Sequence, residues 1–424
     1  MVANVFVVGL DENNAELLHR LPGAEDYRFH ALLDVDEVRI GYTDFRHCLA
    51  RARHLLDSFD GPIDAVTGYW DFPVTSLVPV LCERYGLPST SLESIVKCEH
   101  KYWSRLEQAG VADTCPRFGL VDLHADPPRL PEGLDYPVWL KPVKSASSKL
   151  AYRVRHDREL AEAVTEIRAG IGTVGGPFDA VLERVSLPPE VARAGARACL
   201  AEEAVSGAQV TVEGYRHHHE PHVYGVVDSV CYPGTSSFLR YQYPSTLPEE
   251  AVRRVSEVAK ALVVRLGLRS TTFDIEFFVD TATNRVWVLE VNPRLSQSHA
   301  RLFEAVDGVS NLHCMVSLAL GRDPRMPYRE GPAAVAAKWF LRRFTDGIVR
   351  RVPSPTEIAA VERDLGGVCV VLTTEKGARL SEQYARDSYS YELADIHVLA
   401  NSERELHDKY ERCVSALRFE IDDV

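Results

Sequence analysis

The feature that most constrains the fold is a pair of β-rich segments, residues 273–279 and 286–292, each of which carries a carboxylate. β-Branched and aromatic residues fill both segments, and the polar residues 280–285 between them extend neither strand. The pattern predicts an antiparallel β-hairpin. If its turn is centred near Thr283, Glu276 lies opposite Glu290.

Side-chain alternation predicts which residues of the hairpin share a face. Asp274 and Glu276 share one face of the first arm, and Val288, Glu290 and Asn292 share one face of the second. Facing carboxylates repel one another, so a cation is expected between them. Carboxylate and amide oxygens suit Mg²⁺ or Mn²⁺, and Mg²⁺ usually takes one or two carboxylates plus substrate phosphates. Glu276, Glu290 and Asn292 are therefore the candidate metal ligands.

Arg294 follows the second arm with the same side-chain parity as Asn292, just beyond Pro293. A guanidinium at that point can steady the negative charge of a transferring phosphoryl group. The alternative is an edge hairpin whose acidic residues only face water, and the hairpin alone leaves both interpretations open.

Length, charge and cysteine pattern exclude several classes of protein. A chain of 424 residues exceeds one ordinary core, so two or three domains are expected. A net charge of -13 disfavours a nucleic-acid partner, which needs Lys and Arg against its phosphates. No apolar run approaches the roughly 20 residues that span a bilayer. Nine scattered cysteines without a C-x-x-C pair favour a reducing cytoplasm.

The order of the predicted elements suggests an α/β start and an α+β end. Residues 4–9 read as a buried strand and 15–21 as a helix, the opening of a parallel α/β domain that ends near residue 95. Residues 94–110 read as one helix with Lys97, Lys101 and Arg105 on one face, most simply a solvated face. From about residue 331 the pattern predicts a small α+β module.

Two motifs are set aside. Residues 170–175 spell G-x-G-x-x-G, but a helical pattern precedes them and a strand-like one follows at 180–184, the reverse of the dinucleotide fingerprint, so we predict a loop. The histidines at 217–219 and 222 suit a polar turn between strands better than a metal site, because no ordered ligand spacing appears.

Taken together, these elements resemble the ATP-grasp superfamily, and within it the carboxylate-amine ligases, a group that includes D-alanine:D-alanine ligase and the L-amino-acid ligases. Glu276 with Glu290-Val291-Asn292-Pro293-Arg294 matches the metal-binding E…E-x-N-x-R pattern of the family. The resemblance implies a multidomain α/β and α+β protein with the ATP-grasp fold. Its expected domains are an N-terminal parallel α/β domain at 1–95, an ATP-grasp domain at 96–330 with a mobile lid at about 116–198, and a C-terminal α+β module at 331–424.

The resemblance also implies the residues that bind ATP. Lys101, which follows His100 where the family usually has an aspartate, resembles the first nucleotide lysine, and Lys141 resembles the second. Residues 202–205 resemble the hinge that reads adenine. There Glu202, or the main chain of its neighbour Glu203, takes the amino group and the main chain of Val205 meets the ring.

Two departures from the family pattern concern the loop over the phosphates and the ribose site. Residues 145–150 contain no glycine, so Ser147, Ser148 and Lys149 are expected to stand in for the glycine-rich phosphate loop, with the lysine doing part of the glycines' work. Gln209 stands where many relatives have a glutamate for the ribose, and its amide can still hydrogen-bond hydroxyls.

The implied enzyme joins a carboxylic acid, either an amino acid or another small acid, to an amine through an acyl phosphate, and releases ADP and phosphate. ATP and Mg²⁺ or Mn²⁺ are the expected cofactors, with Arg294 and Arg240 as candidate catalytic residues. For Arg240 a structural salt bridge is an equal alternative. Two other functions stay open, a bicarbonate-using carboxylase and a non-catalytic nucleotide sensor. The identities of both substrates, and the choice between a monomer and a homodimer, are left undecided.

Overall fold

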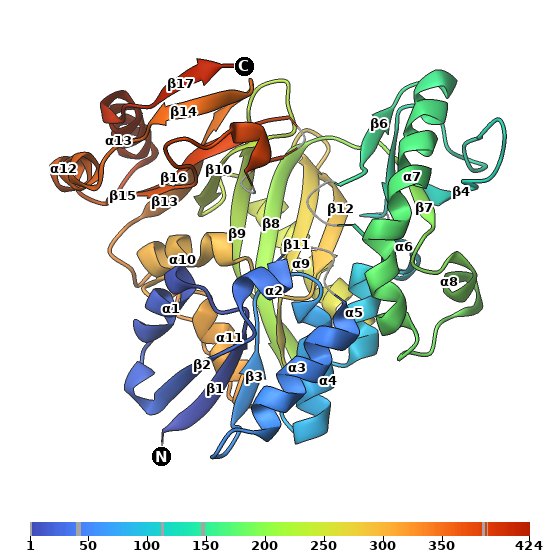
Figure 1. Ribbon diagram of the computed structural model, residues 1–424, viewed down its shortest axis with the longest axis horizontal. Helices are drawn as coiled ribbons and strands as arrows, with labels where there is room; N and C mark the ends of the chain where they lie inside the picture. Colours follow the sequence, from blue (N-terminus) through green and yellow to red (C-terminus); the bar gives the residue numbers. More distant parts are fainter. Residues whose placement is uncertain (1, 40–43, 112–113, 146–148, 384–385, 388) are drawn as a thin grey trace.

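The computed structural model describes residues 2–39, 44–111, 114–145, 149–383, 386–387 and 389–424. Three sheets dominate it in Figure 1. A parallel sheet lies at the bottom near the N-terminus, a small sheet with helix α7 lies at the right, and a large sheet runs through the middle toward the C-terminal helices.

The N-terminal region is a three-stranded parallel sheet with strand order β2-β1-β3. Both faces of β1 are covered, since Phe6 and Val8 join one apolar cluster while Val5 and Val7 join another. A strand buried on both faces needs a continuous apolar run, which is what residues 5–8 supply. The elements are β1 (Ala3–Val8), α1 (Glu12–His19), β2 (Tyr27–Leu32), α2 (Val35–Arg39), α3 (Phe45–Asp57), β3 (Ala65–Thr67) and α4 (Val74–Tyr85).

The predicted single helix over residues 94–110 is wrong. Two helices, α5 (Leu92–Glu99) and α6 (Lys101–Gln108), meet at His100, whose φ of -83° and ψ of 94° are extended. The His100 ring accepts a hydrogen bond from the backbone N–H of Trp103 and caps α6. The break separates Lys97 from Lys101 and turns the second helix toward the hairpin.

The second sheet is antiparallel with strand order β4-β7-β5-β6, and α7 packs on it. Its elements are β4 (Phe118–Val121), β5 (Val138–Pro142), β6 (Tyr152–Val154), α7 (Asp157–Leu182), α8 (Pro189–Ala194) and β7 (Cys199–Glu203). The loop predicted at 170–175 is wrong, because these residues continue α7. Gly175 allows close packing there, since a Cβ on it would lie 2.2 Å from the carbonyl oxygen of Ala196.

The large sheet has eight strands in the order β12-β11-β8-β9-β10-β13-β16-β15, all paired antiparallel. The strands predicted for the C-terminal module therefore extend the sheet that holds the hairpin. Its strands are β8 (Ala208–His217), β9 (Glu220–Cys231), β10 (Phe238–Tyr243), β11 (Thr271–Asp280), β12 (Arg285–Asn292), β13 (Val335–Arg343), β15 (Val368–Leu372) and β16 (Tyr391–Ala400).

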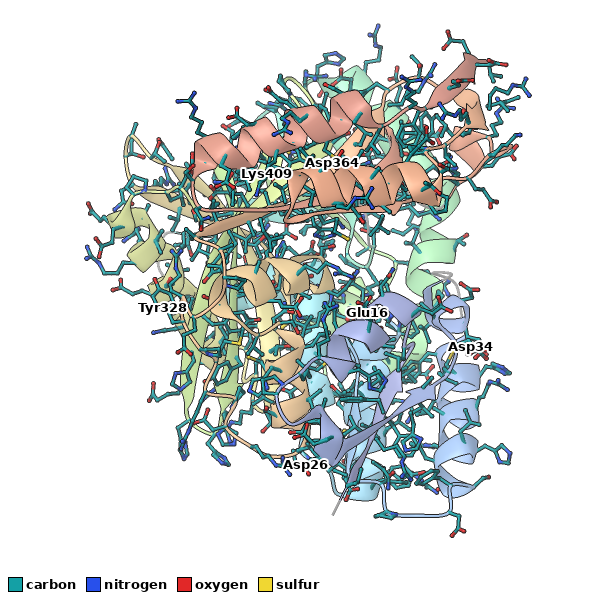
Figure 2. All side chains as sticks on the ribbon, turned by 90° about the vertical axis from the view of Figure 1, so that its left-hand side faces the viewer. Glu16, Asp26, Asp34, Tyr328, Asp364 and Lys409 are labelled. Carbon is teal, nitrogen blue, oxygen red and sulfur yellow. The ribbon has the colours of Figure 1, made fainter. Side chains whose placement is uncertain are left out.

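One face of the large sheet is covered by α9 (Glu249–Arg265), α12 (Pro355–Leu365) and α13 (Glu403–Ala416), whose apolar residues pack on it in two clusters. Figure 2 shows α12, which carries Asp364, beside α13, which carries Lys409. The other face meets α10 (Ala300–Asp307) and α11 (Leu312–Ala319). A two-stranded sheet of β14 (Gly347–Arg351) and β17 (Glu420–Asp423) completes the chain.

Among the residues that the structure describes, no helix has both the length and the apolar character needed to cross a bilayer.

Candidate active site

The hairpin has the predicted register, because Glu276 pairs with Glu290 and Asp274 pairs with Asn292 across β11 and β12. The predicted face of Val288 is wrong. A bulge between Glu276 and Phe277 inserts Leu289 into the second arm, and Val288 turns into the apolar core while Glu290 stays on the other face.

Glu276 stands in an unfavourable electrostatic position. Burial, followed by the charges of Asp274 and Glu290, raises its pKa to about 8. The Gln209 amide donates a hydrogen bond of 3.1 Å to it. The carboxylate is therefore short of positive charge, which is the condition that a bound cation relieves.

Asn292 is oriented by its neighbour Asp274. The Nδ2 of Asn292 donates to Asp274 Oδ1 at 2.9 Å, so the donor end of the amide is engaged and its oxygen is turned away from that bond. A hard divalent cation fits this set, since Glu276, Glu290 and Asn292 all offer oxygen ligands from adjacent positions of the hairpin.

The two predicted nucleotide lysines reach the same place from different elements. Lys101, at the start of α6, forms an ion pair with Glu290. Lys141, on β5, lies with its Nζ 2.7 Å from Glu202 Oε2. Burial lowers the pKa of Lys141, whereas carboxylates led by Glu290 outweigh burial at Lys101 and raise its pKa. A cavity beside them is lined by these four side chains together with Arg105.

Arg105 is a site residue whose role the sequence did not indicate. It is 2% exposed, and its Nε donates to Glu202 Oε1 at 2.8 Å while its Nη2 donates to the backbone oxygen of Leu289 at 2.9 Å. Although Glu202 is buried, Arg105 and Lys141 hold its pKa down to about 2. Arg105 therefore links β7, the predicted adenine hinge, to the bulge of the β11–β12 hairpin.

The hinge prediction is narrowed by these contacts. The Glu202 carboxylate is paired with Arg105 and Lys141, which favours the other alternative for adenine, the main chain of Glu203. The Glu203 side chain contacts Arg117 at 3.3 Å. The roles of Glu203 and Val205 toward the nucleotide stay predictions. Ser147 and Ser148 lie outside the described residues, and Lys149 is exposed.

Arg294 is anchored to the N-terminal domain. Its Nε donates to Asp71 Oδ1 at 2.6 Å, and its Nη1 donates to the backbone oxygen of Leu295 at 3.0 Å. Asp71 follows β3 at the carboxyl end of the parallel sheet, where α/β proteins bind ligands, and that position is the signal that could have pointed to it. Lys144 was also missed. It is buried, and its Nζ lies 2.8 Å from Glu99 Oε2.

The structure does not bring Arg240 to the hairpin carboxylates. The guanidinium of Arg240 lies 5.7 Å from the ring centre of Trp339, and that ring stacks on Tyr410 of α13. The next residue, Tyr241, lies on the other face, where its ring centre is 4.7 Å from that of His299 beside Glu213 and Asp274. Strand alternation thus puts Arg240 on the α13 side of the sheet, where it contacts Trp339 and donates to Gln242 at 3.1 Å, and among the described residues no ion pair of Arg240 supports the salt-bridge alternative.

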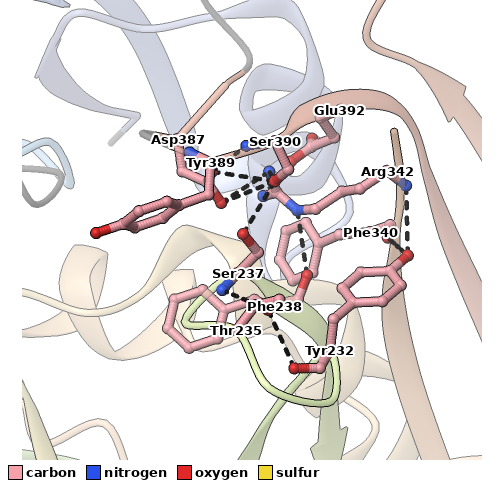
Figure 3. Close-up of polar contacts among 10 residues, drawn as sticks. All are labelled: Tyr232, Thr235, Ser237, Phe238, Phe340, Arg342, Asp387, Tyr389, Ser390 and Glu392. Carbon is pink, nitrogen blue, oxygen red and sulfur yellow. Dashed lines mark hydrogen bonds and ion pairs between the residues drawn. The ribbon is translucent and has the colours of Figure 1, made fainter. Parts of the chain in front are cut away.

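Arg342 occupies a second charged cluster farther along the sheet, shown in Figure 3. Its Nη2 donates to Glu392 at 2.8 Å, its Nη1 contacts Asp387 at 3.3 Å and Ser390 at 3.2 Å, and its Nε donates to the oxygen of Phe238 at 3.1 Å. All three guanidinium nitrogens are bonded within the protein. Arg342 therefore holds strands and loops together, with four of its five N–H groups bonded to described residues.

His218 and His219 form the predicted turn between β8 and β9, while His217 ends β8 and His222 lies in β9. Within the described part of the chain, the one group of three side chains from His, Cys, Asp and Glu that could hold a metal is Glu213, Asp274 and His299. Glu213 already accepts hydrogen bonds from His299 at 2.6 Å and from Tyr224 at 2.6 Å. We interpret this group as a buried hydrogen-bond network behind the hairpin.

The fold and the site together define an ATP-grasp protein. Residues 134–300 match the ATP-grasp domain family. Residues 134–300 thus form an ATP-grasp domain, and the chain as a whole has the ATP-grasp fold. No curated protein sequence matches this chain closely enough to count as a relative.

Solved structures share the whole fold at low sequence identity. An L-amino acid ligase from Bacillus licheniformis superposes with a TM-score of 0.74 at 16% identity, with 99% of each chain covered. Phosphoribosylglycinamide synthetase from Anaerococcus prevotii gives 0.67 at 12% identity and covers 100% of both chains. Biotin carboxylase from Campylobacter jejuni, solved as an ATP-analogue complex, gives 0.67 at 13% identity, with 99% of this chain and 92% of that one covered.

Proposed function

We propose that this protein is an ATP-dependent ligase that activates a small carboxylic acid, such as an amino acid, as an acyl phosphate and joins it to an amine. ADP, phosphate and an amide are the products. The observation that carries the proposal is the pairing of Glu276 with Glu290 across the hairpin. Lys101 and Lys141 line the cavity beside Glu290. A site that gathers oxygen ligands and ammonium groups suits a metal-bound triphosphate.

Glu276, Glu290 and Asn292 would hold Mg²⁺ or Mn²⁺, which neutralises phosphate charge when bound. Lys101 and Lys141 bind the phosphate oxygens of ATP as compact positive charges. The substrate carboxylate attacks the γ-phosphorus, and ADP leaves. A carboxylate oxygen is a poor leaving group, whereas the acyl phosphate gives up phosphate readily when the amine attacks its carbonyl carbon.

Arg294 steadies the negative charge of the acyl phosphate and of the tetrahedral oxyanion, because a guanidinium preorganised in the site needs no rearrangement during the reaction. Residues 116–198 act as the lid that excludes water and protects the acyl phosphate from hydrolysis. The His100 ring contacts the backbone oxygen of Gly195 at 3.0 Å and so links this lid to α6. The proposed domains are 1–95, 96–330 and 331–424.

The expected setting is the cytoplasm, since nine scattered cysteines suit a reducing compartment. The substrates are small molecules, and we leave the choice between monomer and homodimer to a measurement of solution mass.

The test is amine-dependent release of ADP and phosphate from ATP and Mg²⁺, with the twenty common L-amino acids supplied singly and in pairs. The proposal expects at least one pair to give an amide product by mass spectrometry, and expects Glu290→Gln to abolish ADP release. Glu162→Gln, which removes an exposed carboxylate on α7, is the matched control.

Two other results would redirect the proposal. Incorporation of labelled bicarbonate without an amide product would favour the carboxylase. ATP binding without ADP release in any mixture of acids and amines would favour a nucleotide sensor.

A further inference from the structure

Asp71 is a carboxylate of the site that belongs to neither the metal set nor the nucleotide set. It follows β3 and opens the turn into α4, where its backbone oxygen accepts from the N–H of Val74 at 2.9 Å. The preceding residue is fixed as well, because the Trp70 indole donates to the oxygen of Gly9 at 2.7 Å. Asp71 is thus held on a hydrogen-bonded turn, and its side chain, which is 53% exposed to solvent, forms an ion pair with Arg294.

The cations of the site are all paired with carboxylates. Lys101 pairs with Glu290, Lys141 pairs with Glu202 at 2.7 Å, Lys144 pairs with Glu99 at 2.8 Å, and Arg294 pairs with Asp71 at 2.6 Å. Each of these four cations therefore has a carboxylate partner within the protein.

Substrates would exchange these partners in a defined way. The phosphates of ATP would bind Lys101, which frees Glu290 from its ion pair to coordinate a metal ion. Glu202 stays paired with Arg105 when Lys141 binds phosphate. When Arg294 turns to phosphoryl oxygens, Asp71 loses its direct ion-pair partner, and only the more distant charges of Lys144 and Lys101 act on it. An unpaired carboxylate beside bound phosphates is unfavourable, so a positive group of the second substrate is the natural partner.

We infer that Asp71 binds the ammonium group of the amine substrate beside the acyl phosphate, and that the protein therefore selects primary amines that are protonated at neutral pH, such as the α-amino group of an amino acid. This inference rests on the proposed ligase function. An α-amino group has a pKa of about 8, so it arrives as a cation. Asp71 attracts and orients it next to the carbonyl carbon whose phosphate Arg294 holds.

The step balances in atoms and charge. The nitrogen gives up one proton to become nucleophilic and forms a bond to the carbonyl carbon. The carbon–oxygen bond to phosphate breaks, and its electron pair leaves with the phosphate oxygen. Of the two protons that the ammonium nitrogen loses in all, one ends on the phosphate and the other in solvent.

The experiment compares Asp71→Asn with wild type, using the amino-acid pair that gives the most ADP in the screen. Asparagine keeps the shape and an oxygen that accepts from Arg294, but it removes the charge. The KM for the amine should rise about 10- to 100-fold, the range for losing a hydrogen bond to a charged group. The KM for ATP should change little.

Hydroxylamine supplies the second readout. It is uncharged at neutral pH and captures an acyl phosphate as a hydroxamate, so hydroxamate formation should survive in Asp71→Asn. Asp57→Asn is the matched control, because Asp57 is also half-exposed and pairs with an arginine, Arg84 at 3.0 Å, away from the site.

An unchanged amine KM in Asp71→Asn would overturn the inference. A parallel loss of amide and hydroxamate would also overturn it, since Asp71 would then act only through Arg294. If wild type itself releases no ADP in response to any amine, the proposed function fails first, which separates the two failures.

Discussion

Glu276 on β11 lies directly opposite Glu290 on β12, yet only Glu290 forms an ion pair with a lysine, Lys101. Glu290 meets Lys101 at the start of α6, whereas Glu276 lies near Asp274 and accepts a hydrogen bond from Gln209. One arm of the hairpin thus carries a neutralised carboxylate and the other an uncompensated one. This charge deficit is what makes the hairpin a candidate metal site.

Glu276→Gln should remove metal-dependent turnover, by more than about 100-fold, because a metal ligand and its charge are both lost. The same change should stabilise the metal-free protein. A carboxyl whose folded pKa is raised from 4.5 to about 8 destabilises the fold progressively as pH rises through that window. Thermal melting near pH 8 measures the stability of the metal-free protein, and repeating it with Mg²⁺ measures the loss of metal binding that accompanies the loss of turnover. Mg²⁺ should raise the melting temperature of wild type and of Glu162→Gln, but not that of the variant.

Glu202→Gln should unfold the protein more easily, by about 3–5 kcal/mol, because it leaves the buried Arg105 without its carboxylate. Urea denaturation measures the change. The neighbouring Glu203→Gln is the control. Its partner Arg117 has a side chain that is 54% exposed, so that substitution should cost less than about 1 kcal/mol. Equal losses in the two variants would contradict the buried network.

Substitutions of Arg240 and Arg294 should have different effects on turnover. Arg240→Met keeps an apolar contact with Trp339 on the α13 side of the sheet, so turnover should stay within about threefold of wild type even if stability falls. Arg294→Lys loses the planar fork beside the site and should slow turnover by about 100-fold. Measuring kcat and KM at saturating ATP distinguishes them. A large kcat defect in Arg240→Met would restore it to the site.

The hairpin could be predicted because its information is local. β-Branched residues, a polar turn and alternating carboxylates define the register of Glu276 and Glu290. Lys141 could be placed in the same way, because it lies in a short apolar strand, β5. The bulge at Leu289 could not be predicted, because an extra residue in one strand leaves the composition of that strand unchanged.

Contacts between distant segments account for the other differences. Arg105 pairs with Glu202, 97 residues away, and Asp71 pairs with Arg294, 223 residues away. No local sequence pattern predicts such pairs. For Arg240 the segment was placed correctly, but the face of its side chain was not. The stretch around it was expected at the site, and the strand does pass there, but alternation presents Tyr241 and not the arginine.

His100 makes a pH-dependent contribution to stability that can be measured directly. It is fully buried, its ring accepts from the N–H of Trp103, and its other ring nitrogen contacts the oxygen of Gly195. That pattern requires the neutral imidazole with the proton on Nε2. Burial lowers its pKa from 6.5 to about 4. Because the unfolded chain binds the proton more readily, this part of the stability is complete above pH 6.5 and is lost as pH falls toward 4.

His100→Asn tests this contribution, because asparagine still caps α6 but does not titrate. Denaturation curves for wild type and the variant should differ in slope between pH 4 and 6.5, with wild type losing up to about 3 kcal/mol more over that range. His54→Asn serves as the control, since His54 lies in the last turn of α3, away from the site. Parallel pH profiles for wild type and His100→Asn would show that the imidazole titrates equally in the folded and unfolded chain, and would remove it as the neutral link between α6 and the lid.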